Sequence, residues 1–460
     1  MEDQPFLFIP IETKVRELHA KILLACHAAQ AGFSVVMGMQ SELLRRMKYL
    51  PKGIYVEKGI SPLKIPGTRL LKGLGNKVVA WCEEGLVIVD QETYARDRVS
   101  AEVFTMLDAF YAWGQVQAGA IAQKMGPESR KIVIAGNPRF DLLRAPFRAI
   151  FDEEARAIRS RHGDFLLINT NFGLYNNFFG RDYFIENLMR RHGRIQNPEH
   201  EAFLQNWVDH VGKVFDAFQE LLPVLSQYFP DRKIVLRPHP SEDHDVWKKA
   251  VQGLDNVEVI HQGNVIPWIL ASEVLVHNSC TTGVEAYVLG KPVVAYRPVL
   301  SSLYEFELPR AVSIPAFTAE ETIRAIQDIL QNKSLPTPEA AVGKDYAVNI
   351  DGPFSCEIIV DSLRSIAQKA SREHPGVVKT AQARLAWRIK DGWYDAKVLA
   401  NGLIRRKQAY AQYEKQKTGV IELREVEVAI RAFAKVSGSF SEIHAKLLPG
   451  TQMCFTIAKA

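Results

Sequence analysis

The stretch Val274–Val294, VLVHNSCTTGVEAYVLGKPVV, decides how the fold of this chain is interpreted. It opens with an apolar run that is too short for a helix. Helical spacing then extends from Cys280 to Leu289, and Gly290 separates this segment from a second β-branched run. The order predicts a strand, a polar loop, a helix that stops at the glycine, and another strand.

The predicted loop and first helical turn carry hydroxyl groups on Ser279, Thr281 and Thr282. Unpaired backbone N–H groups and the helix dipole favour an anion there, so we expect this turn to hold a phosphate. Glu285 follows one turn later on the same helical face, where its carboxylate could accept hydrogen bonds from a ribose diol. An ordinary capped helix with a partly solvated Glu285 explains the isolated pattern equally well.

Size and composition restrict the class of protein. A chain of 460 residues exceeds the usual size of one domain, and 47% hydrophobic with 24% charged residues is ordinary for a globular protein. The formal charge of +5 is too small to indicate nucleic-acid binding. Five scattered cysteines without C-x-x-C spacing argue against a disulfide framework or a zinc site and favour the cytoplasm. We expect no signal peptide and no membrane-spanning segment.

Short apolar runs alternate with helical segments along most of the chain, which predicts an α/β fold with parallel sheets. We expect a Rossmann-like domain over residues 1–145, a second one over 146–335 and a helical C-terminal extension over 336–460. The expected strands of the first domain are Phe6–Ile9, Phe33–Met37, Ile54–Val56, Lys77–Trp81, Asp108–Ala112 and Lys131–Ala135.

Two polar segments follow strands of the first domain, at the sheet edge where ligands of doubly wound folds bind. One is Ile11–Glu17, IETKVRE, and the other is Cys82–Gly85, CEEG. Glu83 and Glu84 are candidates for a general base, because neighbouring carboxylates raise each other's pKa. A solvated Glu-Glu-Gly turn is the more frequent explanation of such a pair.

Two further polar segments follow strands of the second domain. Thr170 and Asn171 lie in a tight loop after the strand Phe165–Asn169. The segment from Arg237 to Pro240, RPHP, holds His239 between two prolines, which restricts the backbone and fixes the direction of the imidazole. We therefore favour a functional His239 over a core histidine.

The segment Lys379–Lys417 has ten basic and three acidic residues with interleaved tryptophans and tyrosines. This composition suits the surface of an anionic membrane leaflet. A solvated helical hairpin broken at Gly402 is an equally good interpretation.

The motifs together resemble the nucleotide-binding half of bacterial surface-polysaccharide transferases. The resemblance rests on RPHP, followed by HNSxTTGxEA from His277 and by GKPV from Gly290. With CEEG, AGNPRFD and NTNFG the chain is similar to surface carbohydrate biosynthesis proteins over roughly residues 6–300. More distantly it resembles capsule-assembly transferases that use CMP-Kdo.

This resemblance implies the GT-B fold, two doubly wound domains that face each other across a cleft, and glycosyl transfer. The helix terminus, Arg237 and the histidines can neutralise the phosphate, so we expect no metal and no cofactor. The resemblance also implies a donor-phosphate site, a Glu285 that meets the ribose, and a charge-assisted contact from Arg237. The residues that would hold the phosphate are His239, His277, Asn278, Ser279, Thr281 and Thr282, with Thr170 and Asn171 beside them.

The catalytic base implied by the resemblance is a carboxylate of the first domain. We favour Glu84 over Glu83, because Gly85 leaves the backbone free to orient it, although Cys82 stands where relatives carry an acidic residue. The implied donor is a nucleotide sugar, best a CMP-activated ulosonic acid, and the acceptor is a glycan, a lipid-linked glycan or a protein. The expected location is the cytoplasm, and contact with the inner face of the cytoplasmic membrane is left open.

Two other functions remain open from the sequence. A nucleotide-sugar 2-epimerase uses the same fold and also needs carboxylates, but it consumes a sugar nucleotide without any acceptor. A non-catalytic scaffold for polysaccharide assembly would bind no nucleotide and would tolerate His239→Ala.

Overall fold

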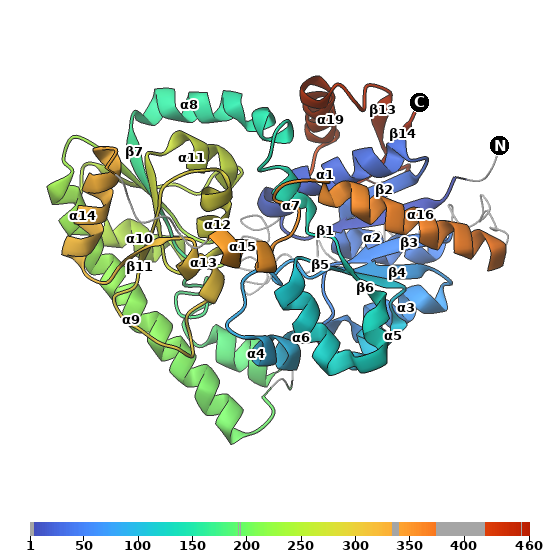
Figure 1. Ribbon diagram of the computed structural model, residues 1–460, viewed down its shortest axis with the longest axis horizontal. Helices are drawn as coiled ribbons and strands as arrows, with labels where there is room; N and C mark the ends of the chain where they lie inside the picture. Colours follow the sequence, from blue (N-terminus) through green and yellow to red (C-terminus); the bar gives the residue numbers. More distant parts are fainter. Residues whose placement is uncertain (1–3, 192, 194, 334–339, 374–418, 452) are drawn as a thin grey trace, which may run out of the picture. The chain divides into compact units, whose positions relative to one another are not determined.

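The computed structural model describes residues 4–191, 193, 195–333, 340–373, 419–451 and 453–460. The chain divides into two compact units, residues 1–150 with 344–460, and residues 151–343. Both are built on parallel sheets flanked by helices, which confirms the expected class of two doubly wound Rossmann-like units (Figure 1). Within the described ranges, no helix combines the length and apolar composition needed to span a bilayer.

The sheet of the first unit has the strand order β13-β14-β2-β1-β3-β4-β5-β6. Its six parallel strands are β1 (Phe6–Ile11), β2 (Ser34–Met39), β3 (Gly53–Glu57), β4 (Lys77–Ala80), β5 (Ala109–Ala112) and β6 (Ile132–Ile134). The first five are mostly buried, as expected for strands covered on both faces, whereas β6 at the sheet edge is half-buried. The order reverses between β1 and β3, so these two carboxyl ends form the switch point where ligands bind in such folds.

Several helices connect the strands of the first unit. They are α1 (Lys14–Gln30), α2 (Gln40–Arg46), α3 (Ile65–Gly73), α4 (Gln91–Arg98), α5 (Ala101–Met106), α6 (Gln115–Met125) and α7 (Pro138–Asp141). Helix α1 is largely buried and packs against α7 and against two later helices, α16 (Ser355–Glu373) and α19 (Leu423–Ser437). The burial of α1 holds the polar residues of its first turn beside the strand ends.

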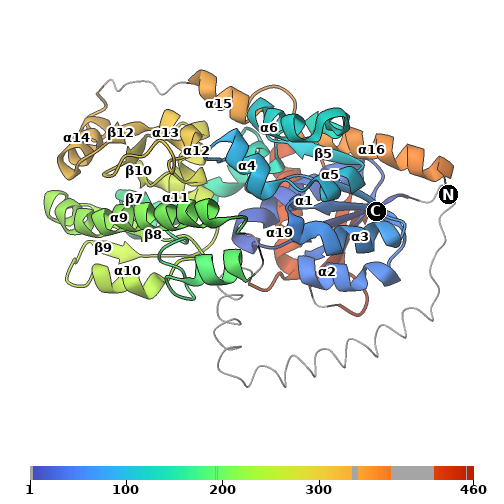
Figure 2. The same ribbon diagram turned by 90° about the horizontal axis from the view of Figure 1, so that it is seen from below.

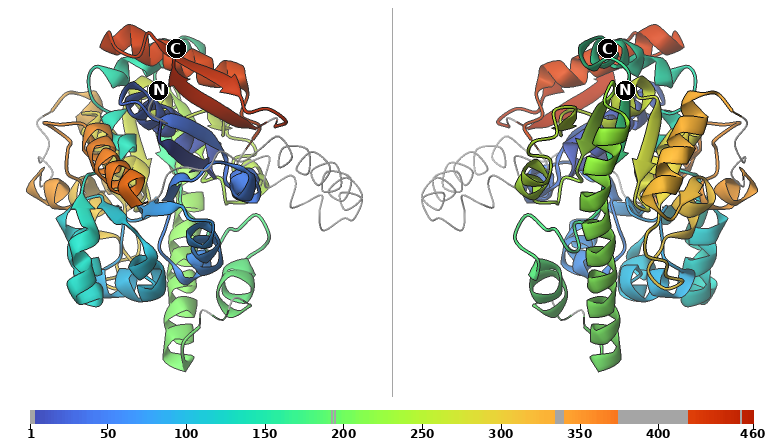
Figure 3. Two further views of the ribbon diagram at one scale, coloured as in Figure 1. Left: turned by 90° about the vertical axis from the view of Figure 1, so that its right-hand side faces the viewer. Right: turned by 90° about the vertical axis from the view of Figure 1, so that its left-hand side faces the viewer.

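The C-terminal part differs from the expected separate helical extension. From Lys344 onward, its described residues belong to the first unit, and its last residues form an antiparallel hairpin of β13 (Ile443–Leu447) and β14 (Cys454–Lys459). Strand β14 pairs with β2, as Figure 3 shows for the red and blue strands. Gly38 permits this approach, because a Cβ there would lie 2.6 Å from the Cys454 sulfur. The basic segment Lys379–Lys417 lies wholly within the gap 374–418, outside the described residues.

The sheet of the second unit contains six parallel strands in the order β12-β11-β10-β7-β8-β9. They are β7 (Phe165–Asn169), β8 (Lys233–Arg237), β9 (Val257–Val259), β10 (Val274–His277), β11 (Val293–Tyr296) and β12 (Ile314–Ala316). After β7 the chain adds β8 and β9 on one side of that strand, and it then crosses over to add β10, β11 and β12 on the other side. The switch point therefore lies between β7 and β10.

Helices cover both faces of this sheet. They are α8 (Asp152–His162), α9 (Pro198–Tyr228), α10 (His244–Ala250), α11 (Val265–Ala271), α12 (Thr281–Val288), α13 (Glu307–Ala311) and α14 (Ala319–Leu330), and α15 (Ala340–Tyr346) follows them. A large apolar core lies where α9, α10 and α14 meet one face, and Figure 2 shows α9 lying along the sheet. The opening stretch forms β10, α12 and β11 as predicted.

Candidate functional site

Each of the two switch points carries a group of polar side chains. In the second unit, the loops after β7 and β10 are joined by Asn278. Its side-chain oxygen accepts a hydrogen bond from the Asn171 N–H at 2.8 Å, and its side-chain nitrogen donates to the Asn171 carbonyl at 3.4 Å. Ser279 follows with φ 51°, a left-handed conformation that is uncommon outside glycine. This turn leads the chain into α12.

The hydroxyls at the start of α12 are half-buried on Thr281 and Thr282. The Thr282 hydroxyl lies 2.6 Å from the Cys280 sulfur, while Glu285 is 4% exposed one turn later. The backbone N–H groups of this turn and the two hydroxyls provide the hydrogen-bond donors that an anion would need at a helix N-terminus.

His277 lies behind this turn rather than on its surface. The residue is fully buried, its Nε2 is 2.9 Å from the Ser313 hydroxyl, and its Nδ1 accepts from the Cys280 N–H at 3.3 Å. Burial lowers the pKa of His277 to about 3, so its ring is neutral near pH 7. A Cβ on Gly283 would lie 2.5 Å from Nε2, so the glycine lets α12 pack directly on the imidazole. His277 thus supports α12 from below.

The Arg237 guanidinium is also bound to groups inside the unit. The guanidinium is 5% exposed, and its Nη1 and Nη2 donate to the carbonyls of Gln262 and Gly263 at 2.8 and 2.6 Å. It lies over the Trp268 ring, 5.6 Å from the centroid. Burial lowers the pKa of Arg237 to about 10, which still leaves it charged at neutral pH. The expected phosphate contact would require these carbonyl bonds to be replaced.

A buried carboxylate that sequence analysis missed, Glu242, organises the loops after β7 and β8. It accepts hydrogen bonds from the Thr170 hydroxyl at 2.7 Å, the Phe172 N–H at 3.1 Å and the His239 N–H at 3.0 Å. Trp247 adds its indole N–H at 2.7 Å. Burial raises the pKa of Glu242, and the four donors oppose that shift.

Thr170 therefore turns its hydroxyl toward Glu242, while His239 stays half-buried with its Nδ1 2.7 Å from the Ser241 hydroxyl. Asn169 was also missed. It is 3% exposed, and within the described residues neither its side-chain oxygen nor its side-chain nitrogen has a hydrogen-bond partner. It ends β7 at the switch point, in register with Arg237 and His277. A polar residue ending an apolar strand is the signal that could have identified it.

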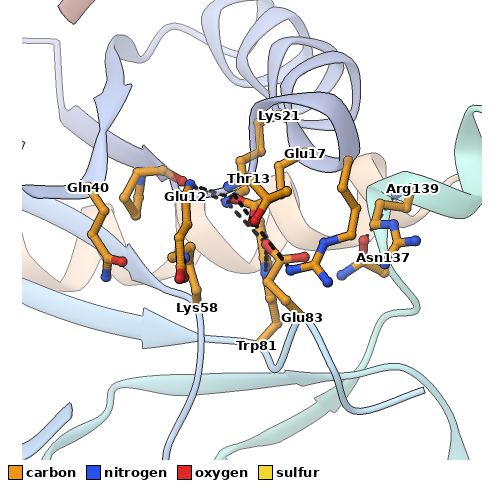
Figure 4. Close-up of polar contacts among 12 residues, drawn as sticks. Glu12, Thr13, Glu17, Lys21, Gln40, Lys58, Trp81, Glu83, Asn137 and Arg139 are labelled. Carbon is orange, nitrogen blue, oxygen red and sulfur yellow. Dashed lines mark hydrogen bonds and ion pairs between the residues drawn. The ribbon is translucent and has the colours of Figure 1, made fainter. Parts of the chain in front are cut away.

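In the first unit, the two motifs IETKVRE and CEEG meet through Lys21. The Lys21 Nζ lies 2.7 Å from Glu17 and 3.0 Å from Glu83, and it also donates to the Pro10 carbonyl at 2.6 Å (Figure 4). Glu83 accepts a further bond from the Trp81 indole at 2.8 Å. These carboxylates are buried and bridged by a cation, which differs from the solvated turn weighed for CEEG.

Glu17 closes the loop between β1 and α1. Its carboxylate accepts from the backbone N–H groups of Glu12 and Thr13 at 3.0 and 3.1 Å. Burial opposes ionisation, but Lys21, Lys58 and Arg16 hold the pKa of Glu17 well below its usual range. Glu17 is therefore a permanent anion that shapes the loop, and it cannot exchange a proton near pH 7.

Glu84 points away from its neighbour. Its side chain is 52% exposed and pairs with Arg98 at 2.8 Å, and Glu84 raises the pKa of that arginine. Glu12 is 44% exposed and pairs with Lys58 across the switch point between β1 and β3. Glu84 and Glu12 are thus the two accessible carboxylates of this rim, and each would have to leave a cation to accept a proton.

Comparisons with known proteins give only remote structural similarities. No family model and no curated protein matches the sequence. Wall teichoic acid polymerase TagF soaked with CDPG is 11% identical with a TM-score of 0.49, covering 80% of this chain and 89% of TagF. Staphylococcus aureus MnaA with UDP has 14% identity and a TM-score of 0.48, covering 80% and 97%. UDP-GlcNAc 2-epimerase from Neisseria meningitidis bound to UDP-GlcNAc is 12% identical with a TM-score of 0.46, and the match covers 78% of this chain and 99% of the epimerase. Similarity this remote does not decide the activity.

Proposed function

We propose that this chain is a glycosyltransferase that moves a sugar from a nucleotide donor to a surface glycan or a lipid-linked acceptor. A CMP-activated ulosonic acid is the first donor to test. The observation that carries the proposal is the rim at the second switch point, where Asn278 joins the loops after β7 and β10. This is where open parallel sheets bind nucleotides.

In this proposal the donor phosphate lies at the start of α12, within reach of Ser279, Thr281 and Thr282. The helix terminus and its hydroxyls stabilise the charge that grows on the phosphate as the sugar leaves. His239, fixed by Glu242 and Ser241, and Asn171 complete the rim. Glu285 is proposed to meet the ribose. His277, Arg237 and Thr170 support this surface from inside the unit, which refines the direct contacts expected from the sequence.

The first unit is proposed to bind the acceptor and to supply the base that removes the proton from its attacking hydroxyl. Glu84 remains our first choice, because it is exposed while Glu83 is buried against Lys21 and Trp81. Arg98 would release Glu84 when substrate binds. Proton removal by a positioned side chain contributes about 10²–10⁴-fold to the rate of such reactions.

A thermal-shift screen against CMP-, UDP-, GDP- and dTDP-linked sugars tests the donor site. A ligand at about 100 times its dissociation constant should stabilise the protein by about 2.7 kcal/mol. Asn278→Ala should remove that shift, whereas Asp245→Ala, an exposed change on α10, should retain it. Stabilisation by none of the four donors would refute nucleotide binding and favour the scaffold.

Product analysis then separates transfer from epimerisation. The donor is incubated with and without a glycan acceptor, and the sugars are identified by mass spectrometry and NMR. A transferase releases the nucleotide only when acceptor is present. Conversion of a sugar nucleotide into its 2-epimer without acceptor would replace the proposal by the epimerase.

A further inference from the structure

The first unit holds a second group of polar side chains, at the turn after β6, that the proposed chemistry does not use. Asn137 and Arg139 lie there, 2% and 8% exposed. The Asn137 side-chain oxygen accepts the Arg139 N–H at 3.0 Å and so caps α7. Its side-chain nitrogen has no hydrogen-bond partner among the described residues. A buried donor left in this state costs about 1–3 kcal/mol, so its persistence calls for an explanation.

Arg16 presents a second donor of the same kind. It belongs to the first turn of α1, which packs against α7. Its Nη2 lies 3.5 Å from Glu17, but its Nε is buried without a hydrogen-bond partner in the described part of the chain. Helices α1 and α7 pack against each other, and each region therefore holds one buried N–H donor that no described residue satisfies.

Arg139 is held close to the CEEG turn by Trp113. The guanidinium lies over the Trp113 ring, 5.9 Å from the centroid, and the Trp113 indole donates to the Cys82 carbonyl at 2.7 Å. Figure 4 shows Asn137 and Arg139 together on one side of Glu17 and Glu83. The turn after β6 thus belongs to the same rim as the proposed base.

The charges of this rim favour an anion as the missing partner. Lys21 bridges Glu17 and Glu83, Lys58 pairs with Glu12, and Arg98 pairs with Glu84. Glu17 and Glu83 share Lys21, so these four carboxylates face three cations, and Arg16 and Arg139 turn the deficit of one positive charge into an excess of one. A planar guanidinium recognises carboxylate and phosphate oxygens with two N–H groups, and an amide N–H adds a third.

We propose that Arg16, Asn137 and Arg139 form an oxyanion site in the first unit, which binds a carboxylate or phosphate group of the acceptor. This inference rests on the proposed function, because it names the acceptor as an anionic glycan. An oxyanion there accepts from the Arg16 Nε, the Asn137 amide and the Arg139 guanidinium. A neutral hydroxyl can accept the same hydrogen bonds but carries no charge to balance the arginines.

Hydrogen exchange of the full chain, measured by mass spectrometry, tests the site locally. The probes are inorganic phosphate, glucuronate and, as a neutral match, glucose. At about ten times its dissociation constant, a bound probe slows exchange through opening of the bound segment by about tenfold. We expect phosphate or glucuronate to protect residues 11–18 and 136–142, and glucose to protect neither. Protection by one anion alone identifies the group recognised.

Two variants and one control sharpen the test. Asn137→Asp keeps the oxygen that caps α7 but loses the donor, and Arg139→Gln loses the charge, so both should abolish protection. Arg130→Gln removes the same charge from a side chain that is 77% exposed, and it should change nothing. The inference is overturned if glucose protects as well as glucuronate, or if protection survives in Asn137→Asp and Arg139→Gln.

The same experiment keeps the two proposals apart. Sugar nucleotides should protect residues 169–173 and 277–283 of the second unit. Protection there without any anion effect in the first unit would refute the oxyanion site alone. An anion effect in the first unit without nucleotide protection would refute the donor site alone, leaving an anion-binding protein of another activity.

Discussion

Replacing Glu242 by glutamine should weaken the second unit and loosen its rim together. The carboxylate is fully buried and accepts four hydrogen bonds, so bulk water cannot replace it as the acceptor for these donors. In Glu242→Gln the amide oxygen can still serve Thr170, Phe172 and His239. The amide nitrogen, however, then faces the Trp247 indole N–H, and two donors meet.

The size of the effect follows from these bonds. The lost Trp247 bond leaves a buried donor unsatisfied, which costs about 1–3 kcal/mol. Three bonds to a charged acceptor become neutral ones, each weaker by about 1 kcal/mol. Removing a buried charge offsets part of this, as the raised pKa of Glu242 indicates. We therefore expect a net loss of about 2–4 kcal/mol in the free energy of unfolding.

Urea unfolding followed by circular dichroism measures the loss, and hydrogen exchange of residues 170–173 and 239–242 locates it. Glu258→Gln is the matched control, because that side chain is 53% exposed on β9. Surface changes of this kind alter stability by about 0.5 kcal/mol or less. Equal stability of the two variants, or unchanged exchange in both loops, would refute the role given to Glu242.

Glu84→Gln should lower turnover by about 10²–10⁴-fold, while donor affinity measured by calorimetry stays the same. Glu83→Gln should mainly lower the melting temperature. Equal, small losses of turnover in both variants would place the base at another residue. His277→Ala and Thr282→Ala should both weaken nucleotide binding, but only the first should also destabilise the second unit, because His277 is buried under α12; unchanged affinity in both would contradict the donor site. Burial raises the pKa of Asp141 to about 6, above its value in the unfolded chain. Protonation therefore favours the folded state at low pH, and this contribution to stability falls as the pH rises from about 4 to about 6. Asp141→Asn should flatten that part of the stability profile in urea titrations, and an unchanged profile would count against the assignment.

The strands could be predicted from the sequence because their signal is local. Phe165–Asn169 and Val274–His277 are continuous apolar runs, which fits strands buried on both faces. The pairing of β14 with β2 could not be predicted, since Cys454 and Gly38 lie at opposite ends of the chain. The hairpin itself is indicated by two short apolar runs on either side of Pro449 and Gly450. No local pattern, however, indicates the strand with which the hairpin pairs.

The candidate site could be predicted where its polar residues directly follow strands, and not where its polar residues are buried between elements. Asn278 and Ser279 were expected from their place after β10. Glu242 and Lys21 are charged residues, which are rarely buried unless they are paired. Their burial follows from partners supplied by other elements, Trp247 and Glu83 among them. The spacing of Glu17 and Lys21 on one helical face was the available signal for half of that cluster.

In both units a buried glutamate fixes the loops at the switch point, which would limit how far these loops move when a substrate binds. In each unit a fully enclosed glutamate accepts backbone N–H groups from rim loops: Glu17 from the loop after β1, and Glu242 from the loops after β7 and β8. Loops tied in this way lose little further freedom when a ligand binds, so more of the contact energy remains as affinity. Ser279 and Glu84, which we propose to meet the ligand, lie next to these loops. Exchange of the tied loops should therefore be slow before any ligand is added, and fast exchange in the free protein would contradict a preformed site.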